Sequence, residues 1–250
     1  MIVVSKANTL LKHKQISHGF FGVPKGEPLN FKTPEEKGIY TPYHAQKALD
    51  ALGEAHAPLI CLNQTHGATI HTVTENFLKT YDATHPPEGD GLVTTLPHVV
   101  LGVQTADCGA LLWYEKKQGI IAATHAGWRG ALHGVLEATW ETIKAYGGRQ
   151  EHLSIGIGPL ITKDHYEVSL EFKNDFLRTD NSFIRFFSEN KGKTHFHLPE
   201  FLLDKLKKMG ITKVSWTQEN TYTTQFFSRR RALHKGQNYG FNYSLIKKIA

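Results

Sequence analysis

Cysteine is scarce in this 250-residue sequence, and long apolar runs are missing from it. The two cysteines, Cys61 and Cys108, are too few for a disulfide scaffold and are consistent with a reducing compartment. No stretch approaches the roughly 20 apolar residues that span a bilayer, and the apolar opening at residues 1–6 is too short for a secretory signal. We therefore expect a cytoplasmic protein with no membrane partner.

Signatures of nucleic-acid binding are also missing, although the chain is basic. The formal net charge is +6 and the isoelectric point is near 9.1, a balance that favours anionic partners. The positive charge is spread along the chain, however, with one dense cluster at residues 229–231, and no zinc-finger, helix-turn-helix or RNP-type motif accompanies it. A small anionic substrate explains the excess equally well, so we expect no nucleic-acid partner.

Internal repeats, low-complexity tracts and long charged linkers are absent as well. A composition of 40% hydrophobic and 21% charged residues is ordinary for a globular protein that buries a sizeable core. We therefore expect a single domain over residues 1–250, as a monomer or weak homodimer.

Hydrophobic periodicity predicts a layered α/β protein with mixed sheets, because strand-like runs come in blocks with helices interspersed. Proline and glycine predict a loop over residues 22–43, and residues 170–193 carry the least clear pattern. Apolar residues at helical spacing predict helices at 42–52, 129–146 and 200–209. β-branched and aromatic runs predict strands at 58–64, 69–73, 91–95, 99–104, 110–114, 120–124, 152–158 and 212–216.

Three short motifs place a reactive side chain directly after an apolar strand, with small residues beside it. Because the ends of strands in one sheet can converge, their side chains His66, Cys108 and His125 can meet. Two imidazoles and one thiolate would give zinc three protein ligands and leave a fourth position for water or substrate, as in a catalytic site. The motifs are NQTHG at 63–67, TADCG at 105–109 and THAGWRG at 124–130.

Spacing alone leaves two other interpretations open. The 15 histidines offer many accidental triples, so buried, hydrogen-bonded histidines with an inert cysteine are one alternative. Cys108 could instead be a nucleophile activated by His125 or His66, with Asp107 orienting the base, and this arrangement needs no metal. Measurement of the metal content and of the effect of a chelator on activity would distinguish the metal site from these two alternatives. Cys61 lies inside an apolar run and is interpreted as a packing residue.

Candidates for substrate binding flank the same motifs. Arg129 falls in the first turn of a predicted helix, where its guanidinium and free backbone N–H groups can hold a phosphate or carboxylate. Arg230 is a second candidate anion ligand, although a basic run is commonly a solvated edge. Trp128 can stack on a planar substrate or pack in the core. The candidate set is completed by Asn63 and Gln64.

The motifs can be compared as a series: NQTHG at 63–67, GDGLVTT at 89–95, TADC at 105–108, HAGWRG at 125–130, IGIGP at 155–159, YEV at 166–168, and FFS followed by RR near the C-terminus. In order and spacing this series resembles the signature of the YfiH family, also called the multicopper polyphenol oxidase or laccase-domain family. The match extends over nearly the whole chain, from about residue 16 onward. As a set, the motifs are highly specific.

The resemblance implies a four-layer α/β/β/α sandwich, similar to the catalytic domain of cytotoxic necrotizing factor toxins, and a zinc site on His66, Cys108 and His125. Copper is possible there and can be adventitious, because divalent copper outcompetes zinc at most N/S sites. Family members are described as enzymes that cleave adenosine, inosine or methylthioadenosine with phosphate and that deaminate adenosine. Others are credited with copper-dependent phenol oxidation, or with editing nucleotide-linked peptidoglycan precursors.

We therefore expect a zinc-dependent purine nucleoside phosphorylase and adenosine deaminase that binds a nucleoside and phosphate. Arg129 and Arg230 would bind phosphate and Trp128 the base, while zinc lowers the pKa of water for deamination and Asp107 shuttles the proton. The expected catalytic residues are Cys108, Asp107 and His125.

Three other functions are weighed against this expectation. A metal-dependent amidase that edits peptidoglycan precursors is the alternative, because a metal hydroxide can attack an amide and a basic cleft can hold a diphosphate. A laccase ranks lower, because a multicopper oxidase needs many more histidines than these. A non-catalytic nucleotide-binding protein would keep the pocket without an open metal position.

Several positions depart from the family pattern. Leu160 stands where many relatives have a cysteine, His197 where they have an aspartate, and Asn220 where a cysteine is expected. Lys-Gly-Gln at 235–237 replaces a Thr-Gly-Arg, a change that would weaken phosphate binding unless Arg229 substitutes for the missing arginine. The three expected metal ligands are intact, so the departures bear on substrate identity.

Overall fold

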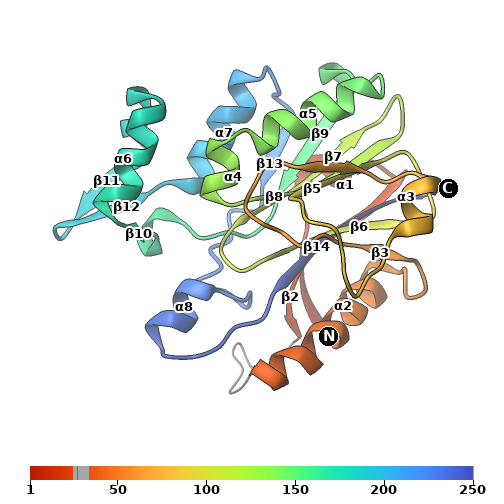
Figure 1. Cartoon of the computed structure of the whole chain (residues 1–250), viewed down its shortest axis with the longest axis horizontal. Helices are drawn as coiled ribbons and strands as arrows, with labels where there is room; N and C mark the ends of the chain where they lie inside the picture. Colours follow the sequence, from red (N-terminus) through yellow and green to blue (C-terminus); the bar gives the residue numbers. More distant parts are fainter. Residues whose placement is uncertain (25–26, 28–33, 250) are drawn as a thin grey trace.

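The computed structural model describes residues 1–24, 27 and 34–249, apart from the side chains of residues 34–41 (Figure 1). The helices are α1 (Asn8–Leu11), α2 (Pro34–Leu52), α3 (Glu75–Thr80), α4 (Trp128–Leu132), α5 (Val135–Ala145), α6 (Leu170–Thr179), α7 (Leu198–Lys208) and α8 (Arg229–His234). The strands are β1 (Ile2–Ser5), β2 (Ile16–Pro24), β3 (Leu59–Ile60), β4 (Ile70–Thr72), β5 (Gly91–Thr94), β6 (Val100–Thr105), β7 (Gly109–Glu115), β8 (Ile120–Ala126), β9 (Leu153–Ile157), β10 (Glu167–Val168), β11 (Phe187–Asn190), β12 (Lys193–Phe196), β13 (Val214–Trp216) and β14 (Asn242–Lys248).

Two mixed sheets lie at the centre of the fold. One has the strand order β1-β2-β14-β6-β3 and the other the order β13-β9-β7-β8-β5-β4. Their middle strands pair antiparallel, whereas β3 with β6, β4 with β5 and β13 with β9 pair in parallel. A small antiparallel sheet, β10-β12-β11, lies with α6 at one end of the molecule (Figure 1).

The alternation of side chains along the strands shows how the layers stack. On β7, Trp113 packs toward α5 and α7, whereas Leu112 packs between the two central sheets. On the far face of the other sheet, Leu245 of β14 packs against Leu49 of α2. The layers therefore follow the order α/β/β/α, as the resemblance implies.

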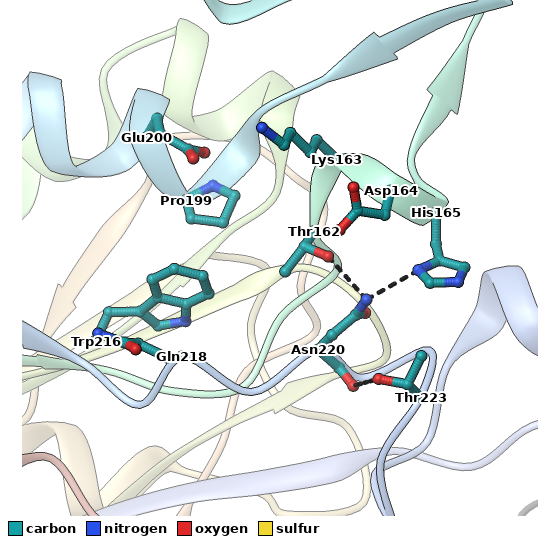
Figure 2. Close-up of a pocket in the computed structure, with 10 residues that line it drawn as sticks. All are labelled: Thr162, Lys163, Asp164, His165, Pro199, Glu200, Trp216, Gln218, Asn220 and Thr223. Atoms are coloured by element: carbon teal, nitrogen blue, oxygen red, sulfur yellow. Dashed lines mark hydrogen bonds between the residues drawn. The ribbon is translucent and has the colours of Figure 1, made fainter. Parts of the chain in front are cut away.

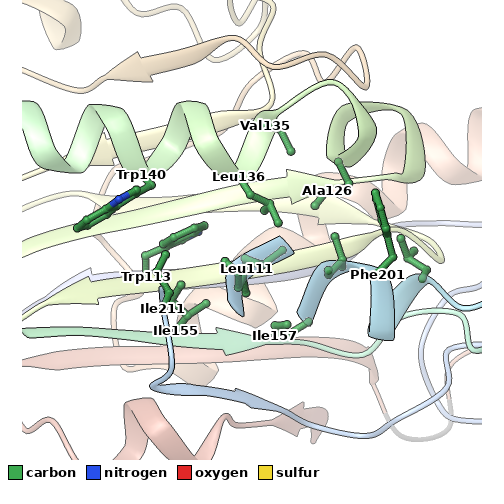
Figure 3. Packing of buried hydrophobic residues seen from close by; sticks show 14 of the residues in the cluster. Leu111, Trp113, Ala126, Val135, Leu136, Trp140, Ile155, Ile157, Phe201 and Ile211 are labelled. Carbon is green, nitrogen blue, oxygen red and sulfur yellow. The ribbon is translucent and has the colours of Figure 1, made fainter. Parts of the chain in front are cut away.

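Burial on both faces explains why the predicted strands read as nearly continuous apolar runs. Figure 3 shows Leu111 and Trp113 of β7 beneath Leu136 and Trp140 of α5. Each such side chain stabilises the fold by roughly 1.5–3 kcal/mol when fully buried. This packing fixes the ends of β6, β7 and β8, where the candidate site residues lie.

The predicted loop over residues 22–43 is wrong at both of its ends, although Glu27 between them lies in a bend. β2 extends to Pro24 and α2 begins at Pro34, whereas residues 25–26 and 28–33 lie outside the described residues. Proline is acceptable at the first position of a helix, whose N–H has no partner there. Pro42 lies inside the helix with its side chain exposed, so proline content alone was a misleading guide.

The predicted helix over residues 129–146 is two helices, α4 and α5. Gly134 between them has φ of 97°, a left-handed conformation that glycine adopts without steric cost and that ends the regular helix. The predicted strand at 58–64 shortens to β3, and the residues after it form the loop that carries His66. None of the helices in the described part of the chain is long and apolar enough to cross a membrane.

Candidate metal centre

The loop after β3, the turn between β6 and β7, and the end of β8 meet at one point. They carry His66, Cys108 and His125, respectively. In the antiparallel pairing of β7 with β8, Ala110 faces His125, which brings the preceding Cys108 turn beside that histidine. The ligand atoms of the three residues all lie within 4.8 Å of one another, and Cys108 Sγ is 3.7 Å from His66 Nε2. The structure thus brings together the three side chains that the motifs single out.

The donor set fits a tetrahedral zinc ion, and one ligand pair has nearly the spacing that such an ion requires. Bond lengths of roughly 2.0–2.1 Å to nitrogen and 2.3 Å to sulfur put neighbouring ligand atoms of a tetrahedron about 3.3–3.6 Å apart. The 3.7 Å between Sγ and Nε2 is close to that value. The rings of His66 and His125 lie edge to face with centroids 4.7 Å apart. His66 is exposed and His125 is buried, so one side of the group is open to an incoming molecule.

The two glycines that flank Trp-Arg in HAGWRG make room for this group. A Cβ on Gly127 would lie 2.9 Å from His66 Cδ2 and 3.0 Å from Cys108 Sγ. A Cβ on Gly130 would lie 2.7 Å from the carbonyl oxygen of Gly67. The start of α4 can therefore pack against the His66 loop only because both positions lack a side chain.

Charge coupling favours Cys108 as a thiolate. Burial alone would raise the pKa of its thiol, but the charge of His125 and hydrogen bonds with His125 and His66 bring that pKa down to about 6. Burial would likewise lower the pKa of His125, but Cys108 and Asp90 outweigh it and raise that pKa to about 9. The sulfur is therefore available as an anionic ligand at neutral pH.

Asp90, which sequence analysis does not assign to the site, lies fully buried beside His125. Its Oδ1 is 2.7 Å from His125 Nδ1. Burial would raise the pKa of this carboxyl, but hydrogen bonds from His125 and from the Gly67 N–H outweigh it and lower the pKa below its ordinary value. The sequence feature that could have pointed to Asp90 is its position between two glycines at residues 89–91, at the start of β5.

Asp107 adopts φ of 96°, an uncommon backbone conformation for a residue with a side chain. Its Oδ1 accepts a hydrogen bond from Thr221 Oγ1 at 2.7 Å, and its Oδ2 accepts one from the Arg230 backbone N–H at 2.7 Å. The carboxylate thus joins the turn that carries Cys108 to the start of α8. Its expected role as a proton shuttle stays a prediction and would require one of these bonds to open.

The expected anion ligands lie on either side of the group. Arg129, in α4, is exposed, and its guanidinium lies 5.3 Å from the centre of the Trp128 ring. Arg230, in α8, donates from Nη1 to the Glu167 carbonyl at 2.8 Å and lies over the Tyr166 ring at 5.6 Å. The neighbouring Arg231 is buried and has a different role, because its guanidinium donates to four backbone carbonyls.

Two further expected substrate-binding residues, Trp128 and Gln64, already have side-chain contacts within the fold. Trp128 packs on Phe172, with ring centroids 4.5 Å apart. Gln64 exchanges hydrogen bonds of 2.7 and 2.8 Å with the backbone of Gln104, which anchors the His66 loop to β6. Asn63 is exposed. Contact of these residues with a substrate stays a prediction.

Two of the departures from the family pattern lie against each other, because Leu160 and Asn220 pair in an isolated parallel bridge. Asn220 Nδ2 donates to Thr162 Oγ1 at 2.8 Å and lies 2.9 Å from His165 Nδ1. Figure 2 shows these three side chains in the wall of a cavity of about 430 Å³, opposite Trp216. The residues that line this cavity include none of the three candidate metal ligands.

A model of the family described as multi-copper polyphenol oxidoreductase laccase matches residues 43–248. The chain belongs to this family. The chain is also similar to a purine nucleoside phosphorylase of Rickettsia conorii, to which it is 34% identical over 188 residues, 74% of this chain and 75% of the relative. An adenosine deaminase named RL5, from an unknown prokaryotic organism, is 28% identical over 193 residues, 72% of this chain and 73% of the relative.

Solved structures share the fold. The crystal structure of a hypothetical YfiH protein of Bacillus licheniformis gives a TM-score of 0.76 at 24% identity and covers 94% of this chain and 93% of that one. A Neisseria meningitidis protein gives a TM-score of 0.76 at 24% identity and covers 100% of this chain and 99% of that one. Together with the layer order, these similarities confirm the expected mixed α/β architecture.

Proposed function

We propose that the protein is a zinc-dependent purine nucleoside phosphorylase that also deaminates adenosine. The observation that carries the proposal is the meeting of His66, Cys108 and His125 around a point that is open on one side. In the described part of the chain, this is the one group of three or more such side chains close enough to share a metal ion. The names of the family relatives, a purine nucleoside phosphorylase and an adenosine deaminase, support the choice of substrate.

Arg129 and Arg230 are the proposed phosphate ligands. The guanidinium of Arg129 makes no hydrogen bond or ion pair with any described residue, so all its N–H groups are available. The backbone of Arg230 is fixed by Asp107 and its Nη1 by Glu167, which leaves its other guanidinium N–H groups available. Charge-assisted hydrogen bonds from two guanidinium groups would hold and orient a phosphate anion.

Tyr166 is a further candidate that the sequence analysis did not assign to the site. Burial, and then the charge of Cys108, raise the pKa of its hydroxyl, while Arg230 opposes the shift. The hydroxyl therefore stays protonated at neutral pH and can donate a hydrogen bond to substrate. A bound zinc ion would supply Lewis acidity, which acidifies water near neutral pH as purine deamination requires.

The test is an assay of zinc-loaded protein with adenosine, inosine and methylthioadenosine, each with and without inorganic phosphate. We expect release of the free base only when phosphate is present, and ammonia from adenosine in either case. Cys108→Ala and His125→Ala should each lower kcat/KM by more than about 100-fold. Removal of a metal ligand costs more activity than removal of a residue that only hydrogen-bonds to a ligand, which typically costs about 10- to 100-fold. A chelator should abolish both activities, and zinc should restore them.

Cys61→Ala is the matched control. Burial raises the pKa of the Cys61 thiol to about 12, and its side chain packs with the core cluster beneath α2, so its removal should leave activity unchanged. Base release that persists in Cys108→Ala would contradict the proposal. Activity found only on a nucleotide-linked peptidoglycan precursor would favour the metal-dependent amidase instead.

We also infer a cytoplasmic location, because both cysteines are free. The proposed partners are a nucleoside and phosphate.

A further inference from the structure

We infer that Asp90 is a positioning residue that sets the geometry of two of the three proposed metal ligands at once. The inference deepens the proposed function and rests on its metal site. The Asp90 carboxylate accepts hydrogen bonds from the His66 loop on one side and from His125 on the other, although these segments are far apart in the sequence. It would therefore couple the placement of His66 to the orientation of His125.

The contact with His125 selects a tautomer. A carboxylate only accepts hydrogen bonds, so the 2.7 Å contact between Asp90 Oδ1 and His125 Nδ1 places the ring proton on Nδ1. Nε2 is then the ring nitrogen left to bind a metal ion, which would displace any proton on it. The backbone is fixed in the same place, because the His125 N–H donates to the Asp90 carbonyl at 2.8 Å. Such partners of metal-binding histidines hold the ring and raise its basicity.

The contact with the His66 loop stabilises an uncommon backbone. His66 has φ of 61°, which for a residue other than glycine costs of the order of 1–3 kcal/mol. Three successive backbone N–H groups donate to the Asp90 carboxylate, those of Thr65 at 3.2 Å, His66 at 3.0 Å and Gly67 at 2.7 Å. Asp90 is 0% exposed, so these bonds form away from competing water. They hold the loop in the conformation that directs His66 toward Cys108.

Replacement of Asp90 by asparagine separates this role from simple packing, because the shape is kept while one acceptor becomes a donor. If the NH₂ group takes the place of Oδ1, it faces the His66 N–H and His125 Nδ1, and His125 must move its proton to Nε2. If it takes the place of Oδ2, it faces the N–H groups of Thr65 and Gly67. The first orientation disturbs both histidine ligands, and the second disturbs the loop that carries His66.

The experiment compares wild-type protein, Asp90→Asn and Asp82→Asn, each stripped of metal and titrated with zinc against a chromophoric chelator. Asp82 is an exposed carboxylate that accepts hydrogen bonds from Thr84, so it provides the same change of charge away from the site. We expect Asp90→Asn to bind zinc about 10- to 100-fold more weakly than wild type, and Asp82→Asn to bind it equally well.

Two spectroscopic measurements distinguish positioning from a general loss of stability. With cobalt(II) as the probe, Asp90→Asn should keep the thiolate charge-transfer band of Cys108 but change the ligand-field bands that report coordination geometry. In the zinc-loaded wild-type protein, the Nδ1 proton of His125 should give an exchange-protected, low-field NMR resonance. The second measurement needs no variant, so it tests the inference even if Asp90→Asn does not fold.

If the zinc affinity and the cobalt spectra of Asp90→Asn equal those of wild type, this inference is wrong and the proposed function still stands. Absence of the protected Nδ1 proton in the wild-type zinc protein would overturn it as well. If the wild-type protein itself does not bind zinc, the metal assignment of the proposed function fails, and this inference fails with it.

Discussion

Gly127→Ala should weaken metal binding at the candidate centre without unfolding the protein. Gly127 has φ of −69° and ψ of 165°, a conformation that alanine adopts without strain, so the effect comes from the added methyl group alone. That Cβ would lie 2.9 Å from His66 Cδ2 and 3.0 Å from Cys108 Sγ, whereas ordinary contact begins at 3.4 Å. The differences, 3.4 − 2.9 and 3.4 − 3.0, mean that the ring must move by about 0.5 Å and the sulfur by about 0.4 Å.

The expected loss of affinity follows from the cost of that displacement. Overpacking by one methyl group costs roughly 1–3 kcal/mol, and each 1.4 kcal/mol is a factor of ten in affinity. If the metal-bound geometry bears the whole cost, zinc should bind roughly 5- to 150-fold more weakly, a change that competition with a chelator measures directly.

Gly67→Ala is the matched control for this prediction. It adds the same methyl group one residue after His66, where the nearest atoms would be Thr65 Oγ1 at 3.4 Å and Asp90 Oδ2 at 3.5 Å, which is ordinary contact. Its zinc affinity should stay close to that of wild type. If Gly127→Ala also binds zinc as tightly as wild type, the argument that the glycine makes room for two ligands is refuted.

Two further predictions concern stability. Burial, and then the charge of Lys6, lower the pKa of His18 from 6.5 to about 4, so the folded state binds fewer protons than the unfolded chain between these values. The free energy of unfolding should therefore fall by about 3 kcal/mol as the pH falls from above 6.5 toward 4, because the unfolded chain takes up the proton that the folded state excludes. In this pH window, urea unfolding of His18→Gln should depend less on pH than that of wild type. Arg231→Met should lower the free energy of unfolding by about 3–5 kcal/mol, because several buried carbonyls lose their donor; an unchanged urea midpoint would contradict that role.

The meeting of three side chains at the candidate centre could be predicted from sequence because the signal at each one is local. His66, Cys108 and His125 each follow an apolar run and have a small residue beside them, and short motifs record both facts. The layered α/β class with mixed sheets could be anticipated for the same reason, since β7 and β8 carry apolar side chains on both faces. The order of the four layers was implied by the family resemblance and not by these local patterns.

The rest of the site depends on contacts that no local pattern records. Asp90 lies 23 to 25 residues from its partners in the His66 loop and 35 from His125, so only the fold shows what its carboxylate binds. β14 was not predicted for a related reason. It carries buried Asn242 and Ser244 among its apolar residues, and their burial comes from the strands on both sides.

The position of β14 has a consequence for biosynthesis. This strand pairs with β2 on one side and β6 on the other, and its Asn242 lies opposite Thr105, three positions before Cys108. During translation β6 therefore lacks one neighbour until residues 242–248 have left the ribosome, long after the three proposed ligands, His66, Cys108 and His125, have been synthesised. The nascent chain therefore carries every proposed metal-binding group before it has the strand that completes the frame aligning them.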